Sequence, residues 1–270
     1  MSNQTLSIRL GTEELMFVLW LLNTPTLPGL GINPFGDLPA EQVAVALASA
    51  ERSLRARRLV GKAEDGSVQM EQVVMALVGT CAVPEHSVVL TCEAPDTGRI
   101  VHYFHATELL ALEHSNPEPG VHLFEALPNA AAILGRLGAL MRLGQQPAPN
   151  AEPVQVTEET LQRATQAARD GPEKALAVLL SLGLEKRTAG ELAAALARTR
   201  RRSALASVQR LREETPISDG FVVLEGPNGL WAMQTMGDDP TAVVNLWPHS
   251  AADVRVRLGE LVAGETLKFS

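Results

Sequence analysis

Four of the six histidines, His102, His105, His114 and His122, lie close together in the sequence, and imidazole commonly binds metals or transfers protons. Their spacing argues against a metal site. His102 and His105 are three positions apart in a segment with strand-like alternation, which places them on opposite faces. The surrounding sequence also lacks the Cys-x-x-Cys and His-Glu-x-x-His spacings of metal sites. We therefore expect these histidines to be structural, with no metal bound.

The two cysteines, Cys81 and Cys92, are the candidate nucleophiles, and His86 lies between them. Cys92 occurs in an apolar strand-like segment, where a buried thiol is inert, and no local motif marks Cys81 as activated. Two cysteines do not make a disulfide scaffold. We interpret both as reduced thiols of a cytoplasmic protein.

A loop rich in glycine and proline, residues 23–36, contains Gly29, Gly31 and Gly36. A phosphate-binding loop would need a preceding strand and a closing Gly-Lys-Ser/Thr, and neither is present. The chain also has no Gly-x-Ser-x-Gly motif and no paired carboxylates typical of acid–base catalysis. We therefore predict no catalytic residue, no cofactor and no enzymatic activity.

Two arginine runs occur at the ends of predicted helices, where cations stabilise the helix dipole. The runs are Arg52, Arg55, Arg57 and Arg58, and Arg198, Arg200, Arg201 and Arg202. The alternative is a winged-helix-like DNA-binding transcriptional regulator, because such domains use the order helix, turn, helix, hairpin. A net charge of −8 makes nucleic acid an unlikely partner.

Aromatic residues are scarce, at 4% of the chain, and gather in two segments. Tyr103, Phe104 and Phe124 fall in one, and Trp231 and Trp247 in the other. Most should be core residues. Because strand neighbours face opposite ways, either Tyr103 or Phe104 turns outward, so we predict Tyr103, Phe104 and Phe124 as partner-binding residues.

The predicted elements that position these residues follow one order twice. In the first half, helices are expected at residues 12–22, 42–58 and 70–80, strands at 87–94, 99–106, 108–114 and 121–127, and a helix capped by Asn129. In the second, helices are expected at 158–170, 173–182 and 189–200, strands at 203–212, 220–225, 229–235 and 242–246, and a helix at 251–262. The closing helices share the sequence Arg-Leu-Gly-x-Leu, at Arg136 and at Arg257.

This repetition predicts an α+β fold with two quasi-equivalent halves, residues 1–148 and 149–270. Each half has leading helices, a four-stranded antiparallel meander and a closing helix. The helices bury one face of the sheet, and the other face needs a partner: its twin, a ligand or another protein. No segment reaches the roughly 18 uninterrupted apolar residues of a membrane span, and residues 15–22 are too short.

The layout resembles the EspG family, the cytosolic chaperones of type VII (ESX) secretion. The resemblance rests on the helix starts at 38–41 and 156–159, the strand series from Ser87 and Ser203, and the two closing helices. It implies a non-enzymatic chaperone or adaptor that binds a secreted helical partner, a PE–PPE type heterodimer, through the hydrophobic tip of the PPE protein. Two departures are the shortened second-half hairpins and the loop at 23–36. No binding residue is carried over from the family, and the oligomeric state is left open.

Overall fold

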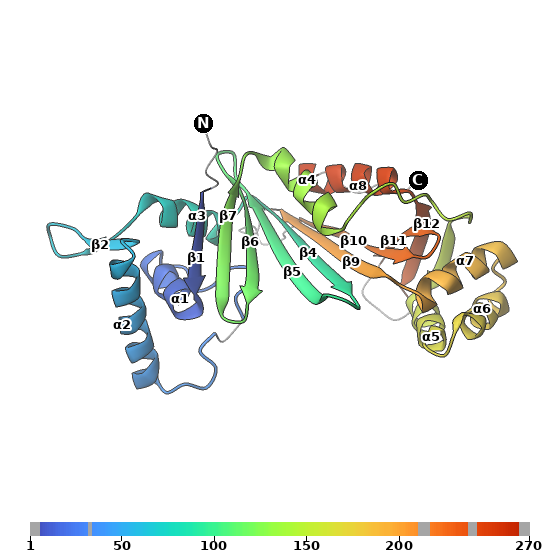
Figure 1. Cartoon of the computed structure of the whole chain (residues 1–270), viewed down its shortest axis with the longest axis horizontal. Coiled ribbons are helices and arrows are strands. Elements are labelled where there is room, and N and C mark those ends of the chain that lie inside the picture. Colours follow the sequence, from blue (N-terminus) through green and yellow to red (C-terminus); the bar gives the residue numbers. More distant parts are fainter. Residues whose placement is uncertain (1–5, 32–33, 210–216, 237–241, 265–270) are drawn as a thin grey trace. The chain divides into compact units, whose positions relative to one another are not determined.

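A computed structural model of the chain describes residues 6–31, 34–209, 217–236 and 242–264 (Figure 1). The helices are α1 Thr12–Leu21, α2 Ala40–Ala56, α3 Gln72–Ala82, α4 Ala130–Leu140, α5 Glu158–Ala168, α6 Pro172–Ser181, α7 Lys186–Ala197 and α8 Ala251–Ala263. The strands are β1 Ser7–Gly11, β2 Val60–Lys62, β3 Val68–Met70, β4 His86–Ala94, β5 Gly98–Ala106, β6 Ala111–Glu118, β7 Val121–Leu127, β8 Val154–Thr157, β9 Arg201–Gln209, β10 Ile217–Gly226, β11 Gly229–Met236 and β12 Val243–His249.

The predicted fold class is confirmed. The order in the first half is strand, helices, the meander β4–β7 and then α4, and in the second half it is strand, helices, the meander β9–β12 and then α8. Each half opens with a strand that the sequence did not predict. These strands, β1 and β8, pair antiparallel with the last strand of their own meander, β7 and β12.

The chain forms two compact units that cut across the predicted halves. The first contains the described residues of 1–88, 101–133 and 208–217, and the second those of 89–100, 134–207 and 218–270. The end of the β4–β5 hairpin and most of α4 thus belong to the second unit. The two units are defined by contacts in space, whereas the predicted halves are defined by the repeated order of elements in the sequence. The predicted boundary at residue 148 therefore stays a prediction.

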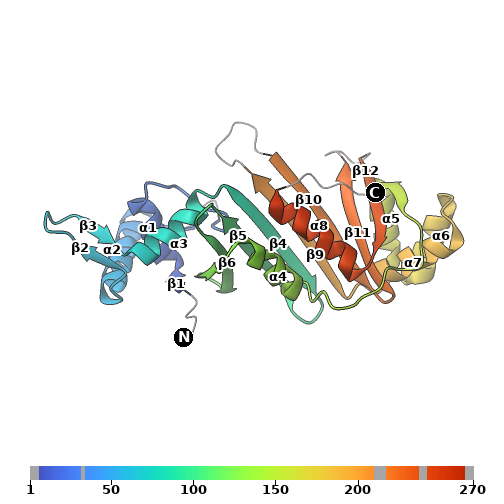
Figure 2. The ribbon, with the colours of Figure 1, turned by 90° about the horizontal axis from the view of Figure 1, so that it is seen from above.

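In the first unit the strand order is β1-β7-β6-β5, and α1 and α3 pack against it (Figure 2). Helix α1 is apolar along most of its length, and Leu15, Val18 and Leu19 are completely buried. Its first turn carries Glu14, which accepts a hydrogen bond from the Gly11 N–H at 3.0 Å. Helix α1 thus begins next to β1 and lies in the core formed with α3.

Residues 59–68, whose Gly61 and Asp65-Gly66 predict a turn before the helix expected at 70–80, belong to the β2–β3 hairpin, and α3 begins two residues later than expected, at Gln72. The preceding helix ends at Ala56 because Arg58 adopts a left-handed conformation (φ 59°) and the Leu59 N–H bonds the Leu54 carbonyl. Gly66 supplies the positive φ of the hairpin turn, at 84°. The two three-residue strands were not predicted, because strands this short show too little alternation of apolar and polar residues to be recognised in the sequence.

In the second unit the strand order is β4-β9-β10-β11-β12-β8. The predicted hairpin at residues 226–229 is confirmed, with Gly226 paired to Gly229 across a two-residue loop. Helices α5, α6 and α7 pack through Ala164, Ala175 and Leu192 into a core that includes Trp231 and Leu246. Ser250 caps α8 by accepting a hydrogen bond from the Asp253 N–H.

Within the described residues, no helix is long and apolar enough to cross a membrane.

Candidate protein-binding groove

A groove of about 1090 Å³ is lined entirely by residues of the second unit. Its floor comes from β9–β12, one wall from α5 with the end of α7, and the other wall from the β4–β5 turn. The lining residues are Glu93, Ala94, Pro95, Gly98, Arg99, Glu158, Leu161, Gln162, Thr165, Gln166, Arg169, Leu196, Thr199, Arg202, Leu205, Gly220, Phe221, Val222, Leu224, Met233, Gln234, Thr235 and Val244.

Strand register places an apolar set on the groove floor. Val222 pairs with Met233, and Thr235 pairs with Val244, so these four side chains lie on one face of the sheet. Leu224, two residues beyond Val222, shares that face. Where β11 and β12 continue past the groove, the same face is covered by α5–α7. The groove therefore lies at the margin of the core under α5–α7, where Leu224, Met233 and Val244 are buried, Val222 is partly buried and Thr235 is exposed.

Helix α5 forms one wall because its two faces differ. Ala164 and Ala168 are buried against the helical bundle. Leu161, Thr165 and Arg169 recur at intervals of four, which puts them on another face along the groove. The helix start is fixed by Thr157, whose hydroxyl accepts a hydrogen bond from the Thr160 N–H at 3.3 Å.

The opposite wall carries a small set of ion pairs. Glu93 lies 3.8 Å from Arg99 and 3.9 Å from Arg202, measured from carboxylate oxygen to guanidinium nitrogen. All three side chains are largely exposed, and such pairs contribute at most about 1 kcal/mol. The Glu93 carboxylate and the two guanidinium groups partly neutralise each other's charge at the rim of the apolar floor.

The chemistry available in the groove is that of recognition. None of its lining residues is a histidine or a cysteine, and its carboxylates come from Glu93 and Glu158. An apolar floor with a polar rim is the anatomy of a protein–protein interface. The groove can therefore bind an apolar protruding segment and orient it with amides, hydroxyls and charges at the edge.

The three predicted partner-binding residues lie in the first unit and not in this groove. Phe104 and Phe124 are completely buried, so neither ring offers a surface to a partner. Tyr103 is half-buried and stacks on His114 at a ring distance of 5.4 Å. Of the three residues, only Tyr103 can still contact a protein partner, and that contact stays a prediction.

The clustered histidines divide between two faces of the first unit's sheet. His102 lies 2.6 Å from the buried Glu113 on one face. On the other, His105 contacts Ser87 at 2.8 Å, and His114 contacts His122 at 3.0 Å. Burial lowers the pKa of His105 to about 4 and that of His114 to about 3. These neutral imidazoles lie in a core, apart from the groove.

Burial also determines the state of the thiols. Cys81 is completely buried, and burial raises its pKa well above the ordinary value. The Cys92 pKa is raised chiefly by burial, and its Sγ lies 3.6 Å from Ser203 Oγ. A raised thiol pKa disfavours the nucleophilic thiolate.

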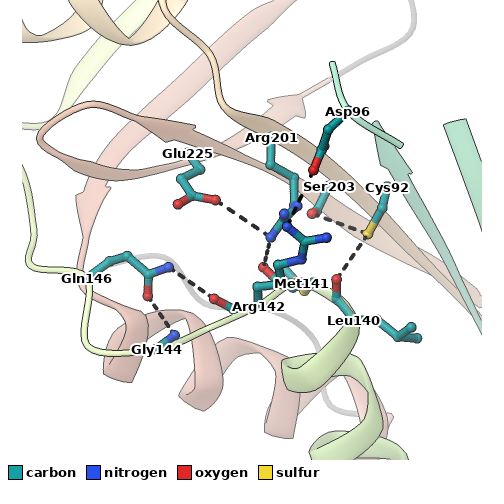
Figure 3. A network of polar contacts seen from close by, with 10 residues as sticks. All are labelled: Cys92, Asp96, Leu140, Met141, Arg142, Gly144, Gln146, Arg201, Ser203 and Glu225. Carbon is teal, nitrogen blue, oxygen red and sulfur yellow. Dashed lines mark hydrogen bonds and ion pairs between the residues drawn. The ribbon is translucent and has the colours of Figure 1, made fainter. Parts of the chain in front are cut away.

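The second arginine run does not form a uniform basic surface. Arg201 and Arg202 belong to β9 and not to the end of α7. Arg201 is buried, donates to the Met141 carbonyl at 2.9 Å and lies 3.7 Å from Glu225 (Figure 3). It therefore binds the C-terminal carbonyls of α4, a different helix from the one expected.

Several other groups hold the same end of α4. Gln146 donates to the Arg142 carbonyl at 3.1 Å, and Arg142 lies 3.7 Å from Asp96 (Figure 3). Arg255, on α8, donates to the carbonyls of Leu143 and Gly144. These side chains bond carbonyls of the segment that follows the helix. The last carbonyls of α4 itself, those of Leu137, Gly138 and Ala139, accept hydrogen bonds from backbone N–H groups of residues 141–143.

Sequence reasoning did not predict the groove residues. It placed α5 within two residues of its observed end. The predicted bare sheet face was the one opposite the helices, and the groove instead lies on the face that α5–α7 pack against, so that expectation stays a prediction. The position of the groove depends on how far α5–α7 extend over the strands of the second unit, a tertiary property without a local pattern.

Comparison with known proteins identifies a structural class. No family model matches the sequence, and no match was found among curated proteins. The fold matches that of a secretion-system chaperone. One matching structure is that of EspG5, the type VII secretion system chaperone of Mycobacterium tuberculosis, in complex with the PE25–PPE41 dimer, with a TM-score of 0.67. The match covers 98% of each chain at 14% sequence identity, so it shows a shared fold.

Proposed function

We propose that the chain is an EspG-like chaperone or adaptor that acts in the cytoplasm and binds a secreted helical protein of the PE–PPE type for type VII secretion. Two observations support this proposal. The chain shares its fold over 98% of its length with a chaperone whose structure was determined with a PE–PPE dimer. It also has a groove suited to protein recognition and lined without histidine or cysteine.

The groove is the observation that carries the proposal. Its volume, about 1090 Å³, is at the upper end for small-molecule pockets, and it is open along one side. The partly buried Val222 and the buried Leu224 and Met233 form an apolar strip along the floor. An amphipathic helix or a helical tip places its apolar residues on one side and fits such a strip. The protein therefore acts by binding, with no chemical turnover.

Co-purification with a PE–PPE type heterodimer tests the proposal. Leu161→Glu and Thr165→Arg place charge on the groove wall, and we expect each to weaken binding at least tenfold, because a buried unpaired charge is costly. Val256→Glu is the matched control, since Val256 is exposed on α8 and does not line the groove. Thermal unfolding of the free variants checks that they are folded. Binding unchanged in both groove variants, or lost equally in the control, would contradict the proposed site.

A further inference from the structure

Three histidines form a row on one face of the first unit's sheet: His105 on β5, His114 on β6 and His122 on β7. His114 Nε2 lies 3.0 Å from His122 Nδ1, and these rings stack at 5.3 Å. His114 also stacks on Phe124, with the ring centres 4.5 Å apart. All three imidazoles are more than nine-tenths buried, and His105 Nε2 and His114 Nδ1 have no hydrogen-bond partner by geometry within the described residues.

A loop of residues 24–30 packs directly over this row. A Cβ at Gly29 would lie 2.6 Å from the Tyr103 ring and 3.0 Å from His114 Cε1, so only glycine allows the backbone to approach so closely. Gly29 also has a positive φ of 89°. Leu27, in the same loop, is 3% exposed and belongs to the core. The loop therefore closes the histidine row from solvent.

Among the described residues, no carboxylate acts on His114 to stabilise a positive charge. The groups that act on it are the neighbouring imidazoles, His122 and His105, which disfavour its protonation, and the Pro28 carbonyl, which favours it. From β5 it also meets the Tyr103 phenol.

The remaining titratable groups nearby belong to other contacts. In α1, Glu14 is bound to Ser53 and Arg57, and Glu13 lies at the helix start near Gly11. In β1, Arg9 pairs with Glu118. Helix α3 contributes the neutral Cys81, and the His122 Nε2 lies 3.4 Å from the Thr12 hydroxyl.

We propose that the His114–His122 pair and the Gly29 loop form an acid-sensitive latch, which is closed while both imidazoles are neutral and opens when they take up protons. Two protons cannot be placed on the pair without two adjacent cations under an apolar loop. Opening brings the rings into water, where each can be protonated independently.

The size of the effect follows from linkage. An imidazole that is neutral when the latch is closed and has its ordinary pKa near 6.5 when it is open raises the opening constant about 30-fold at pH 5. For two such imidazoles, the factors by which each raises the opening constant are multiplied. The expected increase is therefore between about 30-fold and about 1,000-fold.

Amide hydrogen exchange of the full-length protein at pH 7 and pH 5 tests the proposal. The reporters are the amides of Thr24, which donates to the Leu19 carbonyl, and of Leu30, which donates to Leu27. After correction for the intrinsic exchange rate, we expect their protection to fall by at least about 25-fold from pH 7 to pH 5. Equal protection at the two pH values would overturn the proposal.

Substitution shows whether these histidines are responsible. His114→Phe keeps a ring on Phe124 and removes one titrating group, so the pH effect should shrink by about 25-fold. His122→Asn removes the partner imidazole and serves if the first variant does not fold. His249→Gln, in the second unit, is the control and should leave the effect unchanged. An undiminished pH effect in the folded His114 or His122 variant would also overturn the proposal.

Discussion

At the residue scale, burial decides what each chemically active side chain does. Sequence reasoning identified the histidines and excluded a metal motif, because His102 and His105 were expected on opposite faces, and they are. It could not determine which aromatic ring turns inward, because alternation gives two faces without saying which is covered. Phe104 is completely buried, and Tyr103 remains half-exposed beside the Gly29 loop.

Global stability should fall when the pH is lowered below about 6.5. The folded pKa values of His105, about 4, and of His114, about 3, are below the ordinary value, so the unfolded chain binds more protons at intermediate pH. Stability from these groups is complete above pH 6.5 and decreases as the pH falls toward 4 and 3. At pH 5 each histidine should cost about 2 kcal/mol. Urea unfolding at pH 7 and pH 5 measures this, and equal free energies would contradict it.

Glu14 should be important for joining α2 to α1. Burial raises the pKa of Glu14. The hydrogen bonds from Ser53, the Gly11 N–H and Arg57 together lower it by more than burial raises it, so the net shift of the pKa is downward. The Ser53 and Arg57 contacts are 2.7 and 2.6 Å. We expect Glu14→Ala to destabilise the protein by about 2 kcal/mol, measured by chemical unfolding. The neighbouring Glu13→Ala should cost under 0.5 kcal/mol, roughly, and comparable losses would remove the assigned role.

At the element scale, long periodic segments were predicted well and short ones were missed. The strand at 121–127 and the helix starts at Glu158 and Ala251 match the structure. Helix α7 begins at Lys186, three residues before the predicted start, because Glu185 caps it through the Thr188 N–H. Strands β1 and β8 were missed because four or five residues before a helix give no usable alternation. These segments become strands because β1 pairs with β7 and β8 pairs with β12, both far away in the sequence.

The β10–β11 hairpin should depend on Gly229. Its φ is 143°, and an added Cβ would lie 2.3 Å from the Pro147 carbonyl oxygen. Gly229→Ala should therefore destabilise the protein by more than about 1 kcal/mol. Gly259→Ala, inside α8 and with open space around it, should stabilise by about 0.5–1 kcal/mol. Thermal unfolding compares the two, and effects of the same sign would contradict the structural explanation.

At the scale of the whole molecule, the duplicated layout was the most informative feature of the sequence. It predicted the fold class, which the structure confirms, and it motivated the resemblance to EspG proteins. It did not locate the groove, since both halves have the same order of elements. The difference between them is tertiary: α5, α6 and α7 form a bundle on the strands of the second unit, and the groove lies at the margin of that packing.

The whole molecule should bind nucleic acid weakly or not at all. The net charge is −8, Arg201 is buried against the end of α4, and Arg202 faces Glu93. Fluorescence anisotropy with duplex DNA at low ionic strength should show no saturable binding below about 10 µM. Tight binding that weakens with salt, and that Arg200→Ala reduces, would instead favour the DNA-binding regulator considered above.

The pairing of β1 with β7 and of β8 with β12 has a consequence for biosynthesis. Ser7 lies opposite Glu125, and Gln155 lies opposite Asn245, so each outer strand waits for a partner made much later. During translation the N-terminal strand has no place to pair until residue 127 has left the ribosome, and non-local pairing of this kind slows folding. The nascent chain is thus exposed to aggregation during most of its own synthesis. Helix α1 cannot hide its apolar side chains before then, because Leu15, Val18 and Leu19 are buried by packing against neighbouring helices and strands and not within the helix itself.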